Sequence, residues 1–314
     1  MCTFCLELIH QSWTLFLFFH YITDIMRYLE YLAFTYPSLV ELETIGNSYE
    51  GLPIKLAKIS TGLAKNGESK PVVWIDRMHA REWIGPAVAT YILNQLVEKN
   101  TTYLKLLDSS DFMILPILNP DGYEFSHTAD RLWRKTRSSH GVDPNRNFGY
   151  HWGEKESGAA STDPCHETYA GPNAFSEPET RAMAEYILAN RQRIKMYLTL
   201  HSYSQMLLIP WGYTRSRPSD FDELENVARK ATNAMLKVHG TEYQVGASPD
   251  LLYPTSGGSD DWAKGIAGIK YAYTLELRDR GIYGFLLPAR QIVPTARETW
   301  AGIRTITRLV TSNT

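Results

Sequence analysis

Two histidines and a glutamate in this 314-residue chain have the side chains and spacing to hold a divalent metal ion. His79 and Glu82 form an H-x-x-E motif after an apolar run, and residues three apart in a first helical turn point the same way. A catalytic zinc takes imidazole and carboxylate ligands, and it needs three protein ligands with one position open for water. His201, at the end of the apolar run 197–200, is the candidate third ligand. The alternatives are a chance H-x-x-E and a core histidine bonded to a carbonyl.

A carboxylate and two arginine clusters are the other groups that could do chemistry. Glu276 interrupts the apolar run 271–277, where an unpaired buried charge is costly. It is therefore either neutralised by a cation such as Arg278, or it faces a cavity and acts as a base. Arg134 and Arg146 lie in a polar region, and guanidinium groups suit two-point capture of a carboxylate. Solvated surface arginine is the alternative for each.

The elements that must position these residues alternate between short apolar runs and helical patterns, which predicts an α/β domain with a largely parallel or mixed sheet. The region 119–174 has little periodicity and is predicted to be a long, ordered, functional loop. Ser176 and Glu179 have the spacing of a helix capping box. Strands are predicted at 72–76, 112–117, 196–200 and 271–277, and helices at 83–98, 177–190, 222–238 and 295–309.

The net charge argues against binding to nucleic acid or membranes, and the N-terminal segment has several possible interpretations. The formal net charge of -2 gives no electrostatic footprint for nucleic acid or an anionic membrane. The apolar run 13–19 is shorter than the roughly 20 residues that span a membrane. It resembles a signal-peptide core but lacks a preceding basic residue and a cleavage site. Residues 1–18 are therefore interpreted as an extension: a degenerate signal, a remnant of an upstream segment, or a mispredicted start.

Eight segments, in order along the chain, resemble the zinc metallocarboxypeptidase A/B family. The resemblance runs from about residue 19 to the C-terminus. It implies one catalytic domain over 19–314, with a mixed, roughly eight-stranded sheet flanked by helices. The segments are HAREW (79–83), NPDGYEF (119–125), RLWRKTRS (131–138), GVDPNRN (141–147), PCHETYAGPNAFSEPE (164–179), LHSYSQ (200–205), SGGSDDW (256–262) and LELRDRGIYGFLLP (275–288).

The resemblance also implies a role for each candidate residue in removing single residues from peptide C-termini. One Zn²⁺ would lower the pKa of water toward roughly 7. Glu276 matches the family's general base and Arg134 its electrostatic stabiliser of the oxyanion. The zinc ligands would be His79, Glu82 and His201, and the groups around the substrate's terminal carboxylate would be Asn145, Arg146 and Tyr253, with Arg81 lining the same groove.

Specificity follows from the position before Asp261, which in the resembling family lies at the base of the side-chain pocket. Asp260 stands there, as in B-type enzymes, and would pair with a C-terminal lysine or arginine. Ser248, also expected near the pocket, is small enough to admit a long side chain. Gly212 matches the A-type pattern, so a preference for aromatic or aliphatic C-termini is the alternative.

Departures from the family pattern raise a second alternative. The connection from Asp76 to His79 is one residue shorter than usual, which could displace two zinc ligands and cost about 10²-fold in rate. A catalytically impaired peptide-binding relative is therefore the rival hypothesis. Cys165 matches a family disulfide cysteine whose partner is missing, so a free thiol is expected, while Cys2 and Cys5 are interpreted as incidental thiols. The resemblance implies an extracellular, secreted protein, and a monomer is the default.

Overall fold

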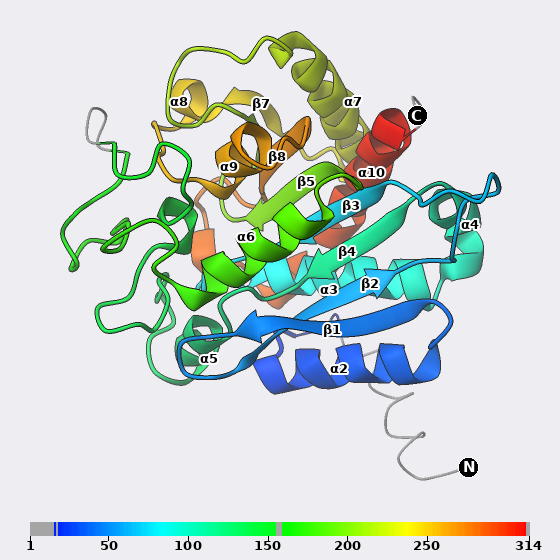
Figure 1. The fold of residues 1–314 in the computed structure, drawn as a ribbon, viewed down its shortest axis with the longest axis horizontal. Coiled ribbons are helices and arrows are strands. Elements are labelled where there is room, and N and C mark those ends of the chain that lie inside the picture. Colours follow the sequence, from blue (N-terminus) through cyan, green and yellow to red (C-terminus); the bar gives the residue numbers. More distant parts are fainter. Residues whose placement is uncertain (1–15, 17, 155–158, 312–314) are drawn as a thin grey trace.

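Eight strands form one mixed sheet at the centre of the molecule (Figure 1). The computed structural model describes residues 16, 18–154 and 159–311, so the predicted extension, apart from Phe16 and Phe18, lies outside the described residues. The sheet order is β1-β2-β4-β3-β5-β8-β6-β7. The strands are β1 (Val40–Asn47), β2 (Pro53–Ile59), β3 (Val72–Asp76), β4 (Asp111–Leu115), β5 (Ile194–His201), β6 (Met206–Ile209), β7 (Gln244–Ala247) and β8 (Tyr271–Glu276).

The middle of the sheet is parallel, which brings several carboxyl ends to one edge. β3 pairs in parallel with β4 and β5, and β5 pairs in parallel with β8. The antiparallel pairs β1–β2, β2–β4 and β6–β8 lie outside this centre. All four predicted strands are confirmed as β3, β4, β5 and β8, with ends shifted by at most two residues.

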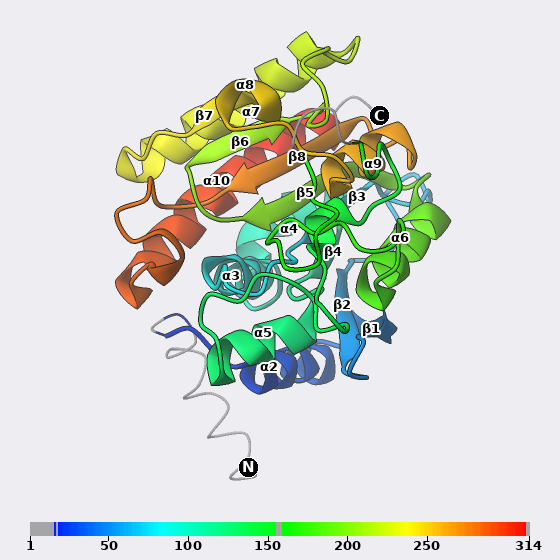
Figure 2. The same ribbon diagram turned by 90° about the vertical axis from the view of Figure 1, so that its left-hand side faces the viewer.

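Helices cover both faces of the sheet (Figure 2). Side chains alternate between the two faces along the strands, so each face has its own hydrophobic core. In β3, Val73 and Ile75 join the core under α2, α3, α4, α7 and α10, whereas Val72 and Trp74 join the core under α6 and α9. The helices are α2 (Ile22–Thr35), α3 (Ile84–Val97), α4 (Asn100–Ser109), α5 (Pro120–Thr128), α6 (Pro178–Asn190), α7 (Phe221–His239), α8 (Ser248–Leu251), α9 (Ser259–Gly265) and α10 (Ile292–Thr311), with short 3-10 turns η1 (Pro144–Arg146), η2 (Gly284–Leu286) and η3 (Ala289–Gln291).

The four predicted helices are confirmed as α3, α6, α7 and α10, but two details are wrong. The region 119–174 is not a continuous loop, because α5 and η1 lie within it. The capping box does not form: Glu177, not Ser176, precedes the first helical residue, and no side chain of the described residues caps α6. Ser176 Oγ contacts Glu177 and Asn147 instead, so a tertiary contact outcompetes the local cap.

The short connection after β3 buries an arginine. The Arg77 side chain is fully buried and packs against Gly85 and the Tyr123 ring. Its Nη2 donates to Ala80 O at 3.0 Å, while Nε and Nη1 have no hydrogen-bond partner among the described residues. Burial lowers the pKa of Arg77 to about 10, a sign that its charge is poorly compensated.

We expect Arg77→Met to stabilise the protein. Methionine keeps an unbranched chain against Gly85 and removes a buried charge with two unsatisfied nitrogens, so the free energy of unfolding should rise by about 1–4 kcal/mol. Denaturant unfolding of the variant beside wild type measures this. Arg229→Met, on the exposed side of α7, is the control and should change little. A loss of stability in Arg77→Met would mean that the contact with Ala80 outweighs the cost of burial.

No helix in the described residues is long and apolar enough to cross a bilayer. Cys165 is an exposed free thiol, as expected from its missing partner. Cys2 and Cys5 lie outside the described residues.

Candidate active site

The parallel strands place the three predicted metal ligands at the carboxyl edge of the sheet. His79 follows β3, and His201 is the last residue of β5. Glu82 lies in the turn between His79 and α3, where its N–H donates to His79 O at 3.4 Å. The H-x-x-E motif therefore sits just before the helix rather than in its first turn, and the turn provides the same-side arrangement that the spacing predicted.

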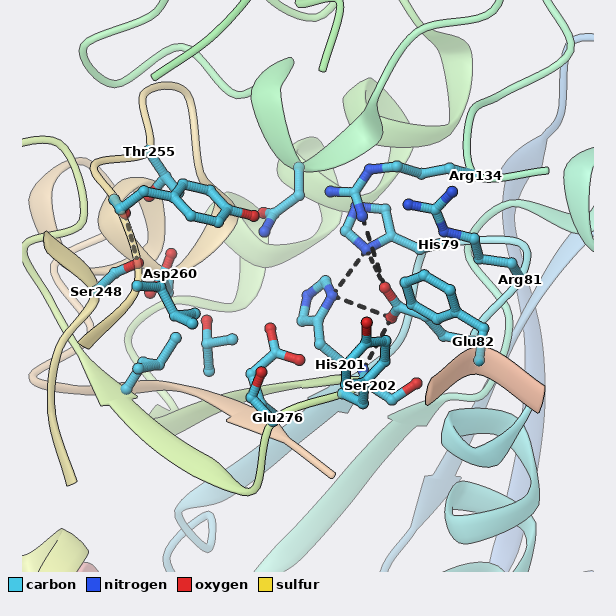
Figure 3. Close-up of a pocket in the computed structure, with 18 of the residues that line it drawn as sticks. His79, Arg81, Glu82, Arg134, His201, Ser202, Ser248, Thr255, Asp260 and Glu276 are labelled. Atoms are coloured by element: carbon cyan, nitrogen blue, oxygen red, sulfur yellow. Dashed lines mark hydrogen bonds and ion pairs between the residues drawn. The ribbon is translucent and has the colours of Figure 1, made fainter. Parts of the chain in front are cut away.

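The donor atoms of these three buried side chains converge on one point (Figure 3). All three lie within 4.8 Å of one another. His79 Nδ1 is 2.9 Å from Glu82 Oε1 and 2.9 Å from His201 Nδ1, and His201 Nδ1 is 3.3 Å from Glu82 Oε2. Ligands of one tetrahedral zinc lie roughly 3.3 Å apart, within a few tenths of an ångström of these separations. The donor set fits zinc, and the short connection before His79 does not pull the ligands apart.

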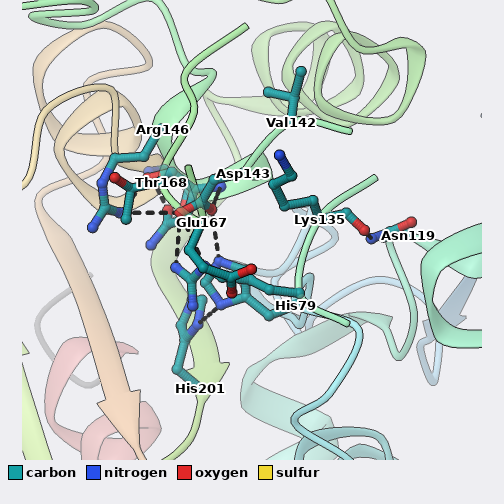
Figure 4. A network of polar contacts seen from close by, with 12 residues as sticks. His79, Asn119, Lys135, Val142, Asp143, Arg146, Glu167, Thr168 and His201 are labelled. Atoms are coloured by element: carbon teal, nitrogen blue, oxygen red, sulfur yellow. Dashed lines mark hydrogen bonds and ion pairs between the residues drawn. The ribbon is translucent and has the colours of Figure 1, made fainter. Parts of the chain in front are cut away.

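Neighbouring side chains fix which nitrogen of each histidine faces the metal position (Figure 4). His79 Nε2 lies 2.9 Å from Asp143 Oδ1. Although burial alone would raise it, Arg134 and His79 hold the pKa of Asp143 well below its usual range. An ionised carboxylate only accepts, so Nε2 carries the proton and Nδ1 keeps its lone pair. The Thr199 hydroxyl lies 3.1 Å from His201 Nε2 and orients that ring in the same way.

Glu276 ends β8 directly beside His201, its register partner on β5. Its carboxyl group faces the cavity that the metal ligands line. Of the two alternatives for Glu276, the structure therefore supports exposure to a cavity rather than neutralisation by Arg278. Arg278 instead pairs with Glu298. Burial raises the pKa of Glu276 to about 7. A carboxylate held beside a metal position at such a pKa is suited to accept and return a proton near neutral pH.

Three nitrogen-rich side chains are held with donors directed into the cavity. Arg134 donates from Nε and Nη2 to Asp143 Oδ2 at 3.0 and 2.9 Å, and its Nη1 remains 3.7 Å from Glu82 Oε1. Arg146 donates to Ala159 O and to the carbonyl of Asn145. The Asn145 side-chain oxygen accepts from Ser259 N, and within the described part of the chain its NH₂ group has no acceptor.

The structure brings all ten predicted site residues into the lining of one cavity of about 250 Å³. Arg81 lies on one side of the metal ligands and Asp260 on the other (Figure 3). Sequence reasoning missed Asp143, although it stands inside the recognised segment 141–147, because nothing in its spacing places it beside His79. It also missed the roles of Thr199 and of several pocket residues, namely Leu208, Leu252, Thr255 and Thr274.

Fold and site together define a zinc-dependent hydrolase with an α/β sheet, and comparison with known proteins supplies the family. The family model "Zinc carboxypeptidase" matches residues 25–302. Carboxypeptidase B of Astacus astacus is 47% identical over 308 residues, which cover 96% of this chain and 98% of that protein. Carboxypeptidase A2 of Mus musculus is 43% identical over 298 residues, covering 92% and 69%.

A solved structure agrees with these relatives. Bovine thrombin-activatable fibrinolysis inhibitor, in complex with tick carboxypeptidase inhibitor, superposes with a TM-score of 0.88 at 40% identity, covering 95% of this chain and 99% of that one. The chain belongs to the zinc carboxypeptidase family. It is therefore a metallocarboxypeptidase whose cofactor is zinc, with His79, Glu82 and His201 positioned to hold the ion.

Proposed function

We propose that this zinc carboxypeptidase releases C-terminal lysine and arginine from peptides and proteins, with residues 19–314 as its catalytic domain. The observation that supports this preference is Asp260, which is 8% exposed and lines the cavity. Burial raises its pKa, and in the described part of the chain no cation forms an ion pair with it. A basic substrate side chain would supply that cation, whereas an apolar one would leave the carboxylate buried and unpaired.

The neighbouring Asp261 does not share this role. Both of its oxygens accept hydrogen bonds from the backbone N–H of Gly212, and one also accepts from Tyr213 N. Asp261 therefore holds a turn, and Asp260 is the carboxylate left for a substrate. Five further residues that line the cavity are uncharged, namely Leu208, Ser248, Leu252, Thr255 and Thr274.

The remaining groups have complementary roles in the proposed reaction. Arg146, the Asn145 amide and the Tyr253 hydroxyl bind the terminal carboxylate, which makes the enzyme an exopeptidase because an internal peptide bond offers no such group. When bound, zinc supplies Lewis-acid activation of water and of the carbonyl. Glu276 removes the proton from the attacking water and later delivers it to the leaving amine. Arg134 Nη1 stabilises the negative charge that develops on the carbonyl oxygen.

We expect Asp260→Asn to lower kcat/KM for a peptide ending in arginine by about 10²–10³-fold, because it removes the buried partner of the guanidinium. Release of phenylalanine from the matched peptide should stay equal or rise. Asp222→Asn, on the exposed surface of α7, is the control and should behave as wild type. Faster release of phenylalanine than of arginine by the wild-type enzyme would replace this proposal with the A-type preference.

The extracellular location and the monomeric state belong to the same proposal and are supported by the family resemblance alone. Immunodetection in the culture medium of expressing cells tests the first, and light scattering of the purified protein tests the second. Retention inside the cell, or a mass of twice the chain mass of 35.8 kDa, would contradict them.

A further inference from the structure

The buried guanidinium of Arg77 has no part in the reaction described above. It lies in the connection between β3 and the first metal ligand, and its side chain is fully buried. Two of its three nitrogens have no hydrogen-bond partner within the described part of the chain. Natural proteins depart from stable packing mainly at their functional sites, so a buried charge this poorly compensated calls for a functional reason.

The one hydrogen bond that Arg77 makes goes to the turn that carries two metal ligands. Its Nη2 donates to Ala80 O at 3.0 Å. Ala80 stands between the ligands His79 and Glu82, and its N–H donates in turn to Arg134 O at 3.2 Å. The position of the Ala80 peptide groups therefore affects the direction of both ligand side chains.

A second donor lies near the same carbonyl oxygen but has a better acceptor. Ser126 Oγ, on α5, is 3.2 Å from Ala80 O and 2.7 Å from Tyr123 O. A hydroxyl group donates only one proton, so the shorter bond, to Tyr123, takes it. Arg77 is therefore the side chain that fixes the Ala80 carbonyl.

Arg77 is itself held between two helices. A Cβ atom at Gly85, in the first turn of α3, would lie 2.7 Å from Arg77 Cγ, so the absence of a side chain there makes room for the arginine. On the other side, the guanidinium carbon is 5.2 Å from the centre of the Tyr123 ring of α5. The backbone is fixed as well, because Leu118 N donates to Arg77 O at 2.9 Å. The guanidinium is thus confined to a position from which it reaches Ala80.

We propose that Arg77 is a positioning residue for zinc. By holding the Ala80 carbonyl, it keeps His79 and Glu82 directed at the metal position although the connection from β3 is short. The inference depends on the zinc site of the family and not on the proposed preference for C-terminal lysine and arginine. Either can therefore fail without the other.

The position of Arg77 and its charge make opposite predictions for zinc binding. A buried cation repels Zn²⁺, so if the charge alone mattered, loss of Arg77 would tighten binding. If the guanidinium positions the turn, its loss weakens binding, by roughly the 10–100-fold that is typical when a group supporting a metal ligand is removed. The sign of the change separates the two effects.

The test is the zinc dissociation constant of the purified, metal-free protein, measured by competition with a chromophoric chelator. Arg77→Met should weaken zinc binding by about tenfold or more, even though the free energy of unfolding of the metal-free variant rises. Gly85→Ala leaves the charge in place but crowds Arg77 Cγ, so it should also weaken zinc binding. This second variant decides the question if Arg77→Met does not fold.

Two control variants should bind zinc as wild type does. Gly302→Ala in α10 crowds Met235 of α7 as closely as Gly85→Ala crowds Arg77, with a nearest approach of 2.8 Å. Arg229→Met removes an exposed arginine from α7. Zinc binding by Arg77→Met that equals or exceeds that of wild type overturns the proposal. An equal loss in Gly302→Ala also overturns it, because the effect would then belong to packing in general.

Discussion

Replacing Glu276 with glutamine is expected to lower kcat for release of a C-terminal residue by about 10²–10⁴-fold. Three acidic residues line the cavity: Glu82 is a metal ligand, Asp260 lies in the side-chain pocket, and Glu276 alone is free to accept a proton. Glutamine keeps the shape but cannot act as a base. Steady-state kinetics together with zinc content of the purified variant measures this. A loss below tenfold with full zinc content would show that another group takes the proton.

The pH profile provides an independent check on the same residue. Burial raises the pKa of Glu276 to about 7 in the metal-free protein. A divalent cation at the neighbouring ligands favours the ionised form, so the pKa should be lower in the zinc enzyme. Because the base works only when ionised, kcat/KM should fall as the pH drops through this value, which lies below 7. In Glu276→Gln this acid limb should disappear, and its persistence would assign the limb to a different group.

Removal of zinc by a chelator is expected to abolish turnover and to lower the unfolding temperature. The three ligands gather two imidazoles and a carboxylate from separate parts of the chain, so the ion binds only the folded state. At free zinc 100 to 1,000 times the dissociation constant, this linkage is worth about 2.7–4.1 kcal/mol. Turnover and thermal unfolding, measured before and after dialysis against the chelator and again after adding zinc, test the expectation.

His201→Ala is the comparison variant for the zinc experiment. It removes one ligand from the end of β5, so the chelator should no longer shift its unfolding temperature. A wild-type enzyme whose turnover and unfolding temperature both withstand the chelator would contradict the assignment of these residues as a zinc site.

The centre of the fold was predictable from sequence because β3, β4, β5 and β8 are buried on both faces and read as apolar runs. The edge strand β1 was not predictable, because its buried and exposed residues do not alternate regularly and three of its eight residues are exposed. In the site, residue types and spacing indicated the ligands and the base as candidates, and the resemblance to a known family decided between the alternatives. Asp143 contacts His79, which is 64 residues away in sequence, so no local pattern reveals its role.

The pairing of β5 with β8 has a consequence for how this enzyme can diverge. His201 and Glu276 are register partners, so the spacing between the metal position and the base is set by backbone hydrogen bonds. A slip of one residue in either strand would turn its side chains to the opposite face and separate the two groups. An insertion or deletion within these strands would therefore disturb the site, whereas one in the connections would leave the pairing intact. The hydrogen-bonded pairing of β5 with β8 thus limits changes of length at the catalytic site more tightly than the loops around the site do.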